Sequence, residues 1–142
     1  MFLFQYPVNL LAEPDGGYVV SFPDFPEAIT QGDNLAEALS AAADCLEEAI
    51  AGRLHERGEI PKPSPRRKHM VSLSPLFSAK TALYLALQEA RVSEAELAKR
   101  LGWRAQEVHR LLDPRATSEL LRFEQALAAL GWQLAVAARK VA

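Results

Sequence analysis

Apolar residues in the first third of the chain recur at the spacing of β-strands. They occupy every second position at the start of the chain: Phe2, Phe4, Tyr6, Val8 and Leu10. This period predicts a strand with one buried face. Gly16 and Gly17 then supply a turn, and residues 18–22 predict the returning strand of a hairpin. The prolines that follow argue against helix, and Ile29 and Thr30 indicate a short third strand.

A helix is expected next, beginning near Leu35, with Asp33 or Asn34 as its cap and Gly58 as its end. Apolar residues recur along it at three- and four-residue intervals, and acidic residues fill its other face. The proline-rich stretch after this helix should run extended, and residues 70–73 predict a last strand. The first part of the chain should therefore be a small antiparallel sheet covered on one face by one helix.

The pattern becomes helical from residue 76 onward. The spacing predicts helices over residues 77–91, 93–101, 104–112 and 118–130. Trp132, Leu134 and Val136 then alternate with other residues, which favours a short C-terminal strand. The chain is thus expected to be an α+β protein with two domains: residues 1–75, and an all-α domain over residues 76–142 that ends in this strand.

Charge is distributed unevenly along the chain. Residues 1–60 hold two basic and eleven acidic side chains, a net charge of −9, whereas residues 61–142 hold fourteen basic and seven acidic ones, a net charge of +7. The asymmetry indicates two modules with oppositely charged partners: phosphate backbones for the basic half and a basic protein for the acidic half. The alternative is that both are ordinary solvated faces.

The single cysteine excludes an intramolecular disulfide framework and is typical of a reducing compartment. Cys45 falls among small apolar residues of the predicted helix and is expected to be a packed structural thiol. Gln5, Pro7 and Asn9 interrupt the opening residues, so they do not form a secretory signal, and no apolar run is long enough for a membrane-spanning helix. We expect a soluble, cytoplasmic protein with no membrane partner.

The segment from Ser93 to Leu112 meets the requirements of a helix-turn-helix. Ser93 can cap the first helix, with Glu96 completing a capping box. Ala98 is small where the helices approach each other, and Gly102 tolerates the left-handed turn between them. Apolar residues fall at the positions that must be buried: Leu97, Leu101, Val108 and Leu111. Trp103 is unusual after the glycine; it either packs on the partner helix or lies at the DNA surface. The alternative is an ordinary helical hairpin in an α-helical core.

If residues 104–112 form a recognition helix, most of its polar residues face outward. The candidate DNA contacts are Lys99, Arg100, Arg104, Gln106, Glu107, His109, Arg110 and Arg115. Arginine binds guanine and glutamine binds adenine through two hydrogen bonds, so Gln106 and Arg110 are the expected base readers. Lys99, Arg100 and Arg115 are expected to contact phosphates. For Glu107 and His109, a plain solvated side chain is an equal alternative.

One helix-turn-helix contacts a half-site, so a two-fold dimer is expected, or a higher homo-oligomer. The last predicted helix supplies more apolar surface than a small domain need bury: Leu120, Leu121, Phe123, Leu127 and Leu130. The strand predicted after it has no partner in a helical domain, and pairing with its twin would satisfy its backbone. The alternative is that this tail packs on its own domain.

Several motifs together resemble the HicB antitoxin family. The N-terminal pattern YPVNL…DGGYVVSFPDFPEAITQGDNLAEAL…GEIPKPS is similar to that family, and SPLFSAKTALYLALQEARVSEAELAKRLGWRAQEVHRLLDP resembles its helix-turn-helix branch, with a lambda-repressor-like DNA-binding domain. The match spans nearly the whole chain. Glu27 stands where the family usually has glycine.

The resemblance implies a type II toxin–antitoxin pair. The partner would be a HicA-like toxin, a small basic RNA-cleaving protein, which a truncated, catalytically inert RNase H-like domain at the N-terminus would cover and inhibit. The C-terminal domain would repress the protein's own operon by binding operator DNA. Four polar residues lie in the loop expected near the toxin: Asp24, Glu27, Gln31 and Asp33.

Two other functions remain open at this point. A nuclease of the RNase H type needs carboxylates that converge on metal ions. Asp15, Asp24, Asp33 and Asp44 are candidates, but they fall on turns, loops and a helix face. We therefore expect no catalytic residue, no metal ligand, no cofactor and no enzymatic activity. The other function is a stand-alone helix-turn-helix transcription regulator whose N-terminal domain senses a small molecule.

Overall fold

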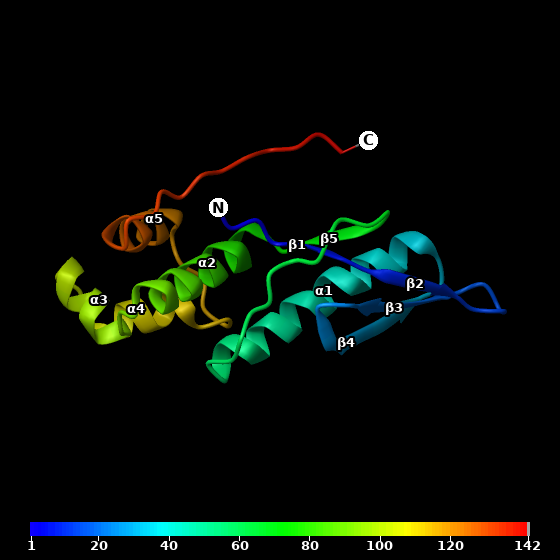
Figure 1. Ribbon diagram of the computed structural model, residues 1–142, viewed down its shortest axis with the longest axis horizontal. Helices are drawn as coiled ribbons and strands as arrows, with labels where there is room; N and C mark the ends of the chain where they lie inside the picture. The colour runs from blue at the N-terminus through cyan, green and yellow to red at the C-terminus, as the bar shows by residue number, and fades with distance from the viewer. Residues whose placement is uncertain (142) are drawn as a thin grey trace. The chain divides into compact units, whose positions relative to one another are not determined.

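The computed structural model describes residues 1–141 as two compact units, the first spanning Met1–Ser78 and the second beginning at Ala79 (Figure 1). Both helices and small antiparallel sheets are present, so the protein belongs to the α+β class.

Five strands form two small antiparallel sheets in the first unit. The strands are β1 (Gln5–Pro7), β2 (Asn9–Ala12), β3 (Tyr18–Phe22), β4 (Phe25–Gly32) and β5 (Met70–Ser72). One sheet has the order β2-β3-β4, and the other pairs β1 with β5.

The prediction of one continuous first strand was wrong. The chain leaves its pairing with β5 after Pro7 and takes up pairing with β3 at Asn9. Between them, the Val8 N–H donates to the carbonyl of His69 at 3.1 Å. The predicted third strand is present but longer, since β4 includes Pro26 within its eight residues. β4 is an edge strand, where a missing N–H is tolerated.

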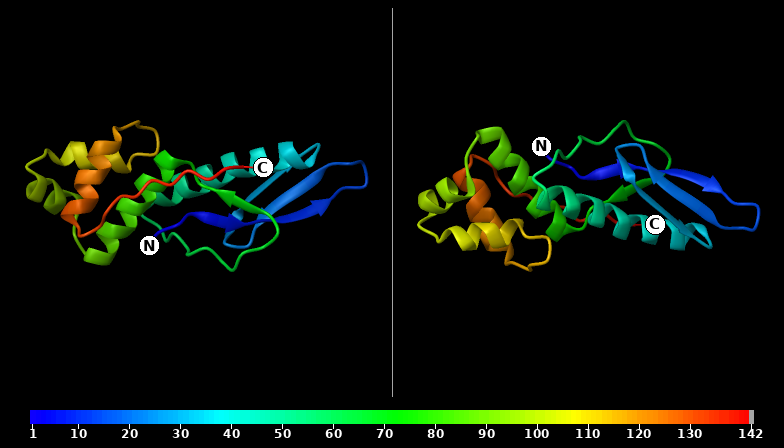
Figure 2. Two further views of the ribbon diagram at one scale, coloured as in Figure 1. Left: turned by 90° about the horizontal axis from the view of Figure 1, so that it is seen from above. Right: turned by 90° about the horizontal axis from the view of Figure 1, so that it is seen from below.

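Helix α1 (Leu35–His55) covers one face of the three-stranded sheet, as both views in Figure 2 show. Asn34, one of the two predicted caps, accepts the N–H of Glu37 at 2.9 Å. The helix crosses the end of β4 so closely that a Cβ on Gly32 would lie 2.4 Å from the Ala38 nitrogen. Its buried stripe faces the sheet: Ala38, Ala42, Leu46, Ile50 and Leu54.

The end of α1 differs from the prediction. The left-handed residue is Arg57, with φ of 57°, and not Gly58. The Gly58 N–H donates to the Arg53 carbonyl at 2.7 Å and the Arg57 N–H to the Leu54 carbonyl at 3.2 Å, which is the Schellman pattern. The left-handed residue that reverses the chain is therefore an arginine, for which this backbone conformation is strained, and the glycine comes one residue later.

The proline-rich segment after α1 is fixed to the core of the first unit. Ile60 is buried, and the carbonyl of Pro61 accepts the hydroxyl of Tyr6 at 2.8 Å. Tyr6 in turn packs edge-on against Phe25, with 4.9 Å between ring centroids. Burial and the charge of Asp24 raise the pKa of Tyr6 above its usual range.

The other helices are α2 (Pro75–Ala90), α3 (Glu94–Leu101), α4 (Ala105–Leu112) and α5 (Leu120–Ala129). The four predicted helices are confirmed, with ends that differ by at most two residues. The strand predicted at Trp132, Leu134 and Val136 is not formed: through residue 141 the tail makes no strand pairing. A strand needs a partner, and none of the described residues pairs with the tail.

Candidate nucleic-acid interface

Helices α3 and α4 are joined by a short turn whose geometry is fixed by capping. Ser93 caps α3 through a hydrogen bond from the Glu96 N–H at 3.1 Å. At the other end, Gly102 is left-handed with φ of 71°, and the Trp103 N–H donates to the Ala98 carbonyl at 2.9 Å. The glycine at the predicted turn position is thus confirmed, because a side chain is disfavoured at this φ.

The predicted capping box of α3 is only half formed. The carboxylate of Glu96 forms an ion pair with Arg100 at 3.3 Å, one turn along the same helix. The hydrogen bond that the Ser93 hydroxyl accepts from the Glu96 N–H therefore forms the cap alone. At the start of α4, by contrast, the Glu107 carboxylate accepts the Arg104 N–H at 2.8 Å. Sequence reasoning assigned the reciprocal contact to the wrong helix of the pair.

A common core holds the two short helices. Leu97 and Ala98 of α3 are buried, as are Val108, Leu111 and Leu112 of α4. Both helices also pack against α5, whose Phe123, Ala126 and Leu127 are buried. The predicted inward positions are confirmed, except that Leu101 is half-buried.

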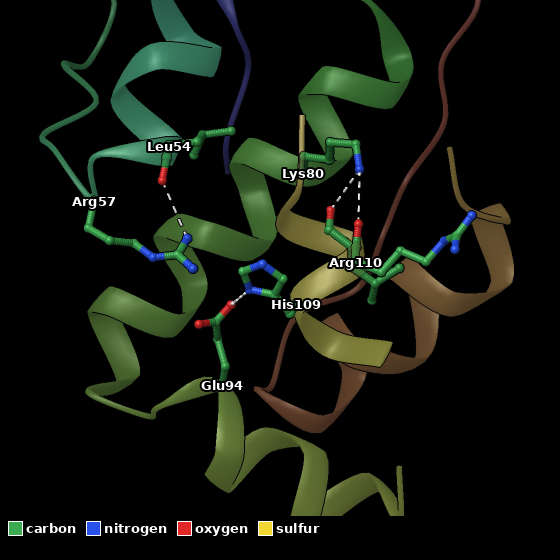
Figure 3. A network of polar contacts seen from close by, with 7 residues as sticks. Leu54, Arg57, Lys80, Glu94, His109 and Arg110 are labelled. Atoms are coloured by element: carbon green, nitrogen blue, oxygen red, sulfur yellow. Dashed lines mark hydrogen bonds and ion pairs between the residues drawn. The ribbon is translucent and has the colours of Figure 1, made fainter. Parts of the chain in front are cut away.

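Most of the candidate DNA contacts lie on the surface of this unit. The exposed ones are Lys99, Arg100, Arg104, Gln106, His109, Arg110 and Arg115. Gln106 and Arg110 are one turn apart on α4, so they share a face of the helix. His109 points toward Glu94 of α3, with 3.4 Å between Nδ1 and the carboxylate oxygen (Figure 3).

Glu107 and Trp103 have structural contacts. Besides accepting the Arg104 N–H, the half-buried Glu107 carboxylate lies 3.6 Å from the Arg122 guanidinium of α5. Arg122 also lies over the ring of Trp103, 4.5 Å from its centroid. The tryptophan ring thus contacts α5 through a cation–π interaction, and α5 was not one of the two positions expected for it. Sequence reasoning missed Arg122, since nothing in the spacing links it to the turn.

The four residues expected near a toxin fall into two groups. Asp24 accepts the N–H of Ser64 at 2.9 Å and also its hydroxyl, which ties the β3–β4 turn to the proline-rich segment. Glu27 forms a two-fold contact with Arg53 at 2.8 and 2.9 Å, and the hydrogen bonds lower the pKa of this carboxyl. Gln31 and Asp33 are exposed. The structure does not bring all four together as a free polar surface.

The charge of each unit differs from the split seen in the sequence. The first unit holds six basic and eleven acidic side chains, a net charge of −5, and the second unit ten and seven, a net charge of +3. The shift arises because Lys62, Arg66, Arg67 and Lys68 precede β5, which pairs back onto β1. The two units still have opposite signs.

Within residues 1–141, no three His, Cys, Asp or Glu side chains lie where they could hold a metal ion together. No helix in that range is long and apolar enough to cross a membrane. Cys45 is half-buried, its Sγ lies 3.8 Å from the Ile29 carbonyl, and burial raises the pKa of this thiol. These features match the packed structural thiol expected from the sequence.

Comparison with known proteins identifies the class. Residues 5–82 match the family described as HicB_like antitoxin of bacterial toxin-antitoxin system. The chain is 37% identical over 134 residues to Antitoxin HicB of Escherichia coli (strain K12), which covers 93% of this chain and 97% of that protein. It is 37% identical over 130 residues to Antitoxin HicB 1 of Photorhabdus laumondii, covering 92% and 84%. With Antitoxin HicB of Pseudomonas fluorescens the identity is 36% over 132 residues, covering 91% and 90%.

The protein is therefore an antitoxin of a bacterial toxin–antitoxin system. Antitoxins of this kind are regulatory proteins and not enzymes. The chain belongs to the HicB antitoxin family.

Proposed function

We propose that this antitoxin binds and inhibits a HicA-like, RNA-cleaving toxin through its first unit and represses its own operon through its second. In this proposal α3 and α4 are a helix-turn-helix, and α4 is the recognition helix. The observation that carries it is the left-handed Gly102 between two short, capped helices, with Gln106 and Arg110 exposed on one face of the second.

The exposed residues divide by the contacts we assign to them. Gln106 and Arg110 read base edges in the major groove, as glutamine reads adenine and arginine reads guanine. Lys99, Arg100 and Arg115 contact phosphates and fix the register of the helix on the duplex. Arg104 and His109 are exposed beside them. We assign Glu107 to the cap of α4, because its carboxylate already has two partners.

The DNA-binding proposal is tested with two arginine variants. Arg110→Ala should cost about 1–3 kcal/mol at one or two base positions of the operator. Arg100→Ala should weaken binding to all sequences and flatten the dependence of affinity on salt by about one unit of slope. Arg91→Ala is the control, since it removes the same charge from the same unit outside α3 and α4. Equal operator affinity of Arg110→Ala and the wild type would refute the recognition helix.

The open face of the three-stranded sheet supports toxin binding by the first unit. Val19 pairs with Leu11 on one side and Gln31 on the other, so all three side chains share a face. Val20, their neighbour on β3, is buried and Leu11 is 67% exposed, which places this face on the solvent side. Ile29 belongs to the same face and is 63% exposed. We propose that the toxin covers this face, with Gln31 and Asp33 among the polar contacts, on the truncated RNase H-like domain.

The second unit has apolar surface for a homodimer. Leu120 and Leu121, at the start of α5, are 55% and 54% exposed, and Val136 of the tail is 77% exposed. Leu120 and Leu121 are neighbours in the chain, and adjacent exposed apolar side chains are typical of interaction surfaces. We propose that two copies pair through α5 and the tail, so that two recognition helices reach two half-sites about 34–36 Å apart.

A further inference from the structure

A lysine lies in the interior of the second unit. Lys80, on α2, has no exposed surface, and its ammonium donates to the backbone carbonyl of Leu111 at 3.0 Å. A longer contact of 3.5 Å reaches the carbonyl of Arg110 (Figure 3). The ring of Phe123, on α5, faces the same ammonium with 5.5 Å to its centroid. One charged group therefore links α2, α4 and α5.

The two carbonyls belong to the last turn of α4, where backbone acceptors have no partner within the helix. The Asp113 N–H donates to the carbonyls of His109 and Arg110 at 3.0 and 3.3 Å. The ammonium of Lys80 meets the Leu111 carbonyl that follows. A positive charge at this end of a helix also interacts favourably with the helix dipole.

The buried charge is costly for the fold. Desolvation lowers the pKa of Lys80, although the nearby carboxylate of Asp113 acts in the opposite direction and Arg110 adds to the lowering. An unbranched apolar side chain of similar length would fill the same space without desolvating an ammonium. The hydrogen bond that the ammonium donates to the buried Leu111 carbonyl offsets part of this cost.

The Lys80 contact acts on α4, a helix that would not be stable by itself. α4 has eight residues, far fewer than a helix needs to be stable alone in water. Its start is held by Glu107 through Arg104 and Arg122, and its end by Lys80. One of the carbonyls that Lys80 contacts is that of Arg110, which we propose as a base reader.

We propose that Lys80 is a positioning residue for DNA recognition: its ammonium clamps the last turn of α4 to α2 and α5 and thereby sets where Arg110 meets the base edge. This inference rests on the proposed operator binding. Lys80 itself touches no phosphate, because its side chain is wholly buried. Its loss should therefore affect specific binding and leave non-specific binding unchanged.

The test compares Lys80→Met with wild type in the full chain, using an operator duplex and a non-specific duplex of equal length at several salt concentrations. Operator affinity should fall about tenfold or more, equivalent to one lost bidentate base contact. Affinity for the non-specific duplex should stay within about twofold, and the salt slope should not change. Lys99→Met should instead weaken both duplexes and flatten the slope by about one unit.

Two further variants make the result decisive. Lys62→Met removes the same charge from the first unit and should leave both affinities unchanged. Lys80→Arg keeps a cation that can donate to two carbonyls, so it should recover most of the operator affinity. Cooperative unfolding, followed by fluorescence of Trp103 and Trp132, checks that the second unit is folded. If Lys80→Met does not fold, Lys80→Gln replaces it, as an uncharged side chain that still donates one hydrogen bond.

Two results would overturn the inference, and they are distinguishable. If wild type prefers the operator and the folded variant prefers it equally, Lys80 does not position α4, whereas the proposed function stands. If wild type does not distinguish the operator from the non-specific duplex, the proposed operator binding fails and the role of Lys80 fails with it.

Discussion

The turn between α3 and α4 should depend on the backbone of one residue. Gly102 has φ of 71°, and a Cβ placed on it would meet no atom within 4 Å. Gly102→Ala therefore introduces no clash, and only the cost of a left-handed non-glycine residue remains, about 1–2 kcal/mol. Alanine also restricts the unfolded chain, which offsets about 0.4–1 kcal/mol of that cost. We expect the second unit to lose about 1 kcal/mol of stability.

Gly52→Ala is a matched control for which we expect the opposite effect on stability. Gly52 lies within α1, and a Cβ there would also meet no atom within 4 Å. Its φ is not positive, so Gly52→Ala should stabilise the first unit by about 0.8–1 kcal/mol, the difference in helix propensity. The two variants make the same chemical change in equally open space, and only the backbone conformation differs.

Thermal unfolding of the full chain measures both effects. Trp103 and Trp132 both belong to the second unit, so their fluorescence reports the midpoint for Gly102→Ala. Far-UV circular dichroism follows the helices of both units, so the midpoint for Gly52→Ala is that of the transition that tryptophan fluorescence does not report. A change of 1 kcal/mol should move a midpoint by about 4–8 °C in units of this size. If both midpoints move in the same direction, the left-handed turn is not what makes Gly102 necessary.

Two further predictions concern the partners. Asp33→Lys should weaken binding of the toxin by about tenfold as measured by calorimetry, whereas Asp15→Lys, the same charge reversal in the β2–β3 turn, should not; equal effects would mean that only net charge matters. Deleting residues 132–142 should shift the dimer toward monomer in analytical ultracentrifugation and weaken operator binding, and an unchanged mass and affinity would exclude the tail from the interface.

Local patterns predicted α3 well, because this helix carries its own start and stop signals. Ser93 and Gly102 act through the backbone next to them, so the residue type alone predicts the capping hydrogen bond and the left-handed turn. The end of α1 shows the limit of this reasoning. A glycine was present, but the reversal falls on Arg57, because the burial of Leu54 and Ile60 on either side fixes where the helix must stop.

The sheet was harder to predict, because strands depend on partners elsewhere in the chain. Alternation continues through Val8, yet the chain changes partner there, from β5 to β3. The period of two residues determines which face is buried, and Phe4, Tyr6 and Val8 are indeed buried. It does not determine which strand lies alongside. The strand predicted after Gly131 is not formed for the same reason, since its alternating residues have no strand partner among residues 1–141.

Side-chain partners were the least predictable part of the site. Nothing at Glu107 indicates Arg122, and nothing at Arg110 indicates Lys80, because these contacts join helices that are adjacent only in three dimensions. A lysine within a mostly apolar helical segment is ordinarily expected to extend its ammonium into water. Only packing shows that Lys80 does not.

The ion pairs of α3 and α4 are compatible with a DNA-binding role. Arg100 forms an ion pair with Glu96, and the His109 ring contacts the Glu94 carboxylate; all four side chains are exposed or half-exposed. Such pairs contribute about 0–1 kcal/mol and are screened by salt. A phosphate contact also releases a condensed counterion, so exchanging Glu96 for a phosphate is favourable for Arg100 at low salt. Glu107 differs. If its carboxylate moved away, the Arg104 N–H at the start of α4 would lose its acceptor, and the contact with Arg122 would also be lost. Glu94 and Glu96 can therefore give up their contacts with His109 and Arg100 to DNA at little cost, whereas the contacts of Glu107 have to be kept.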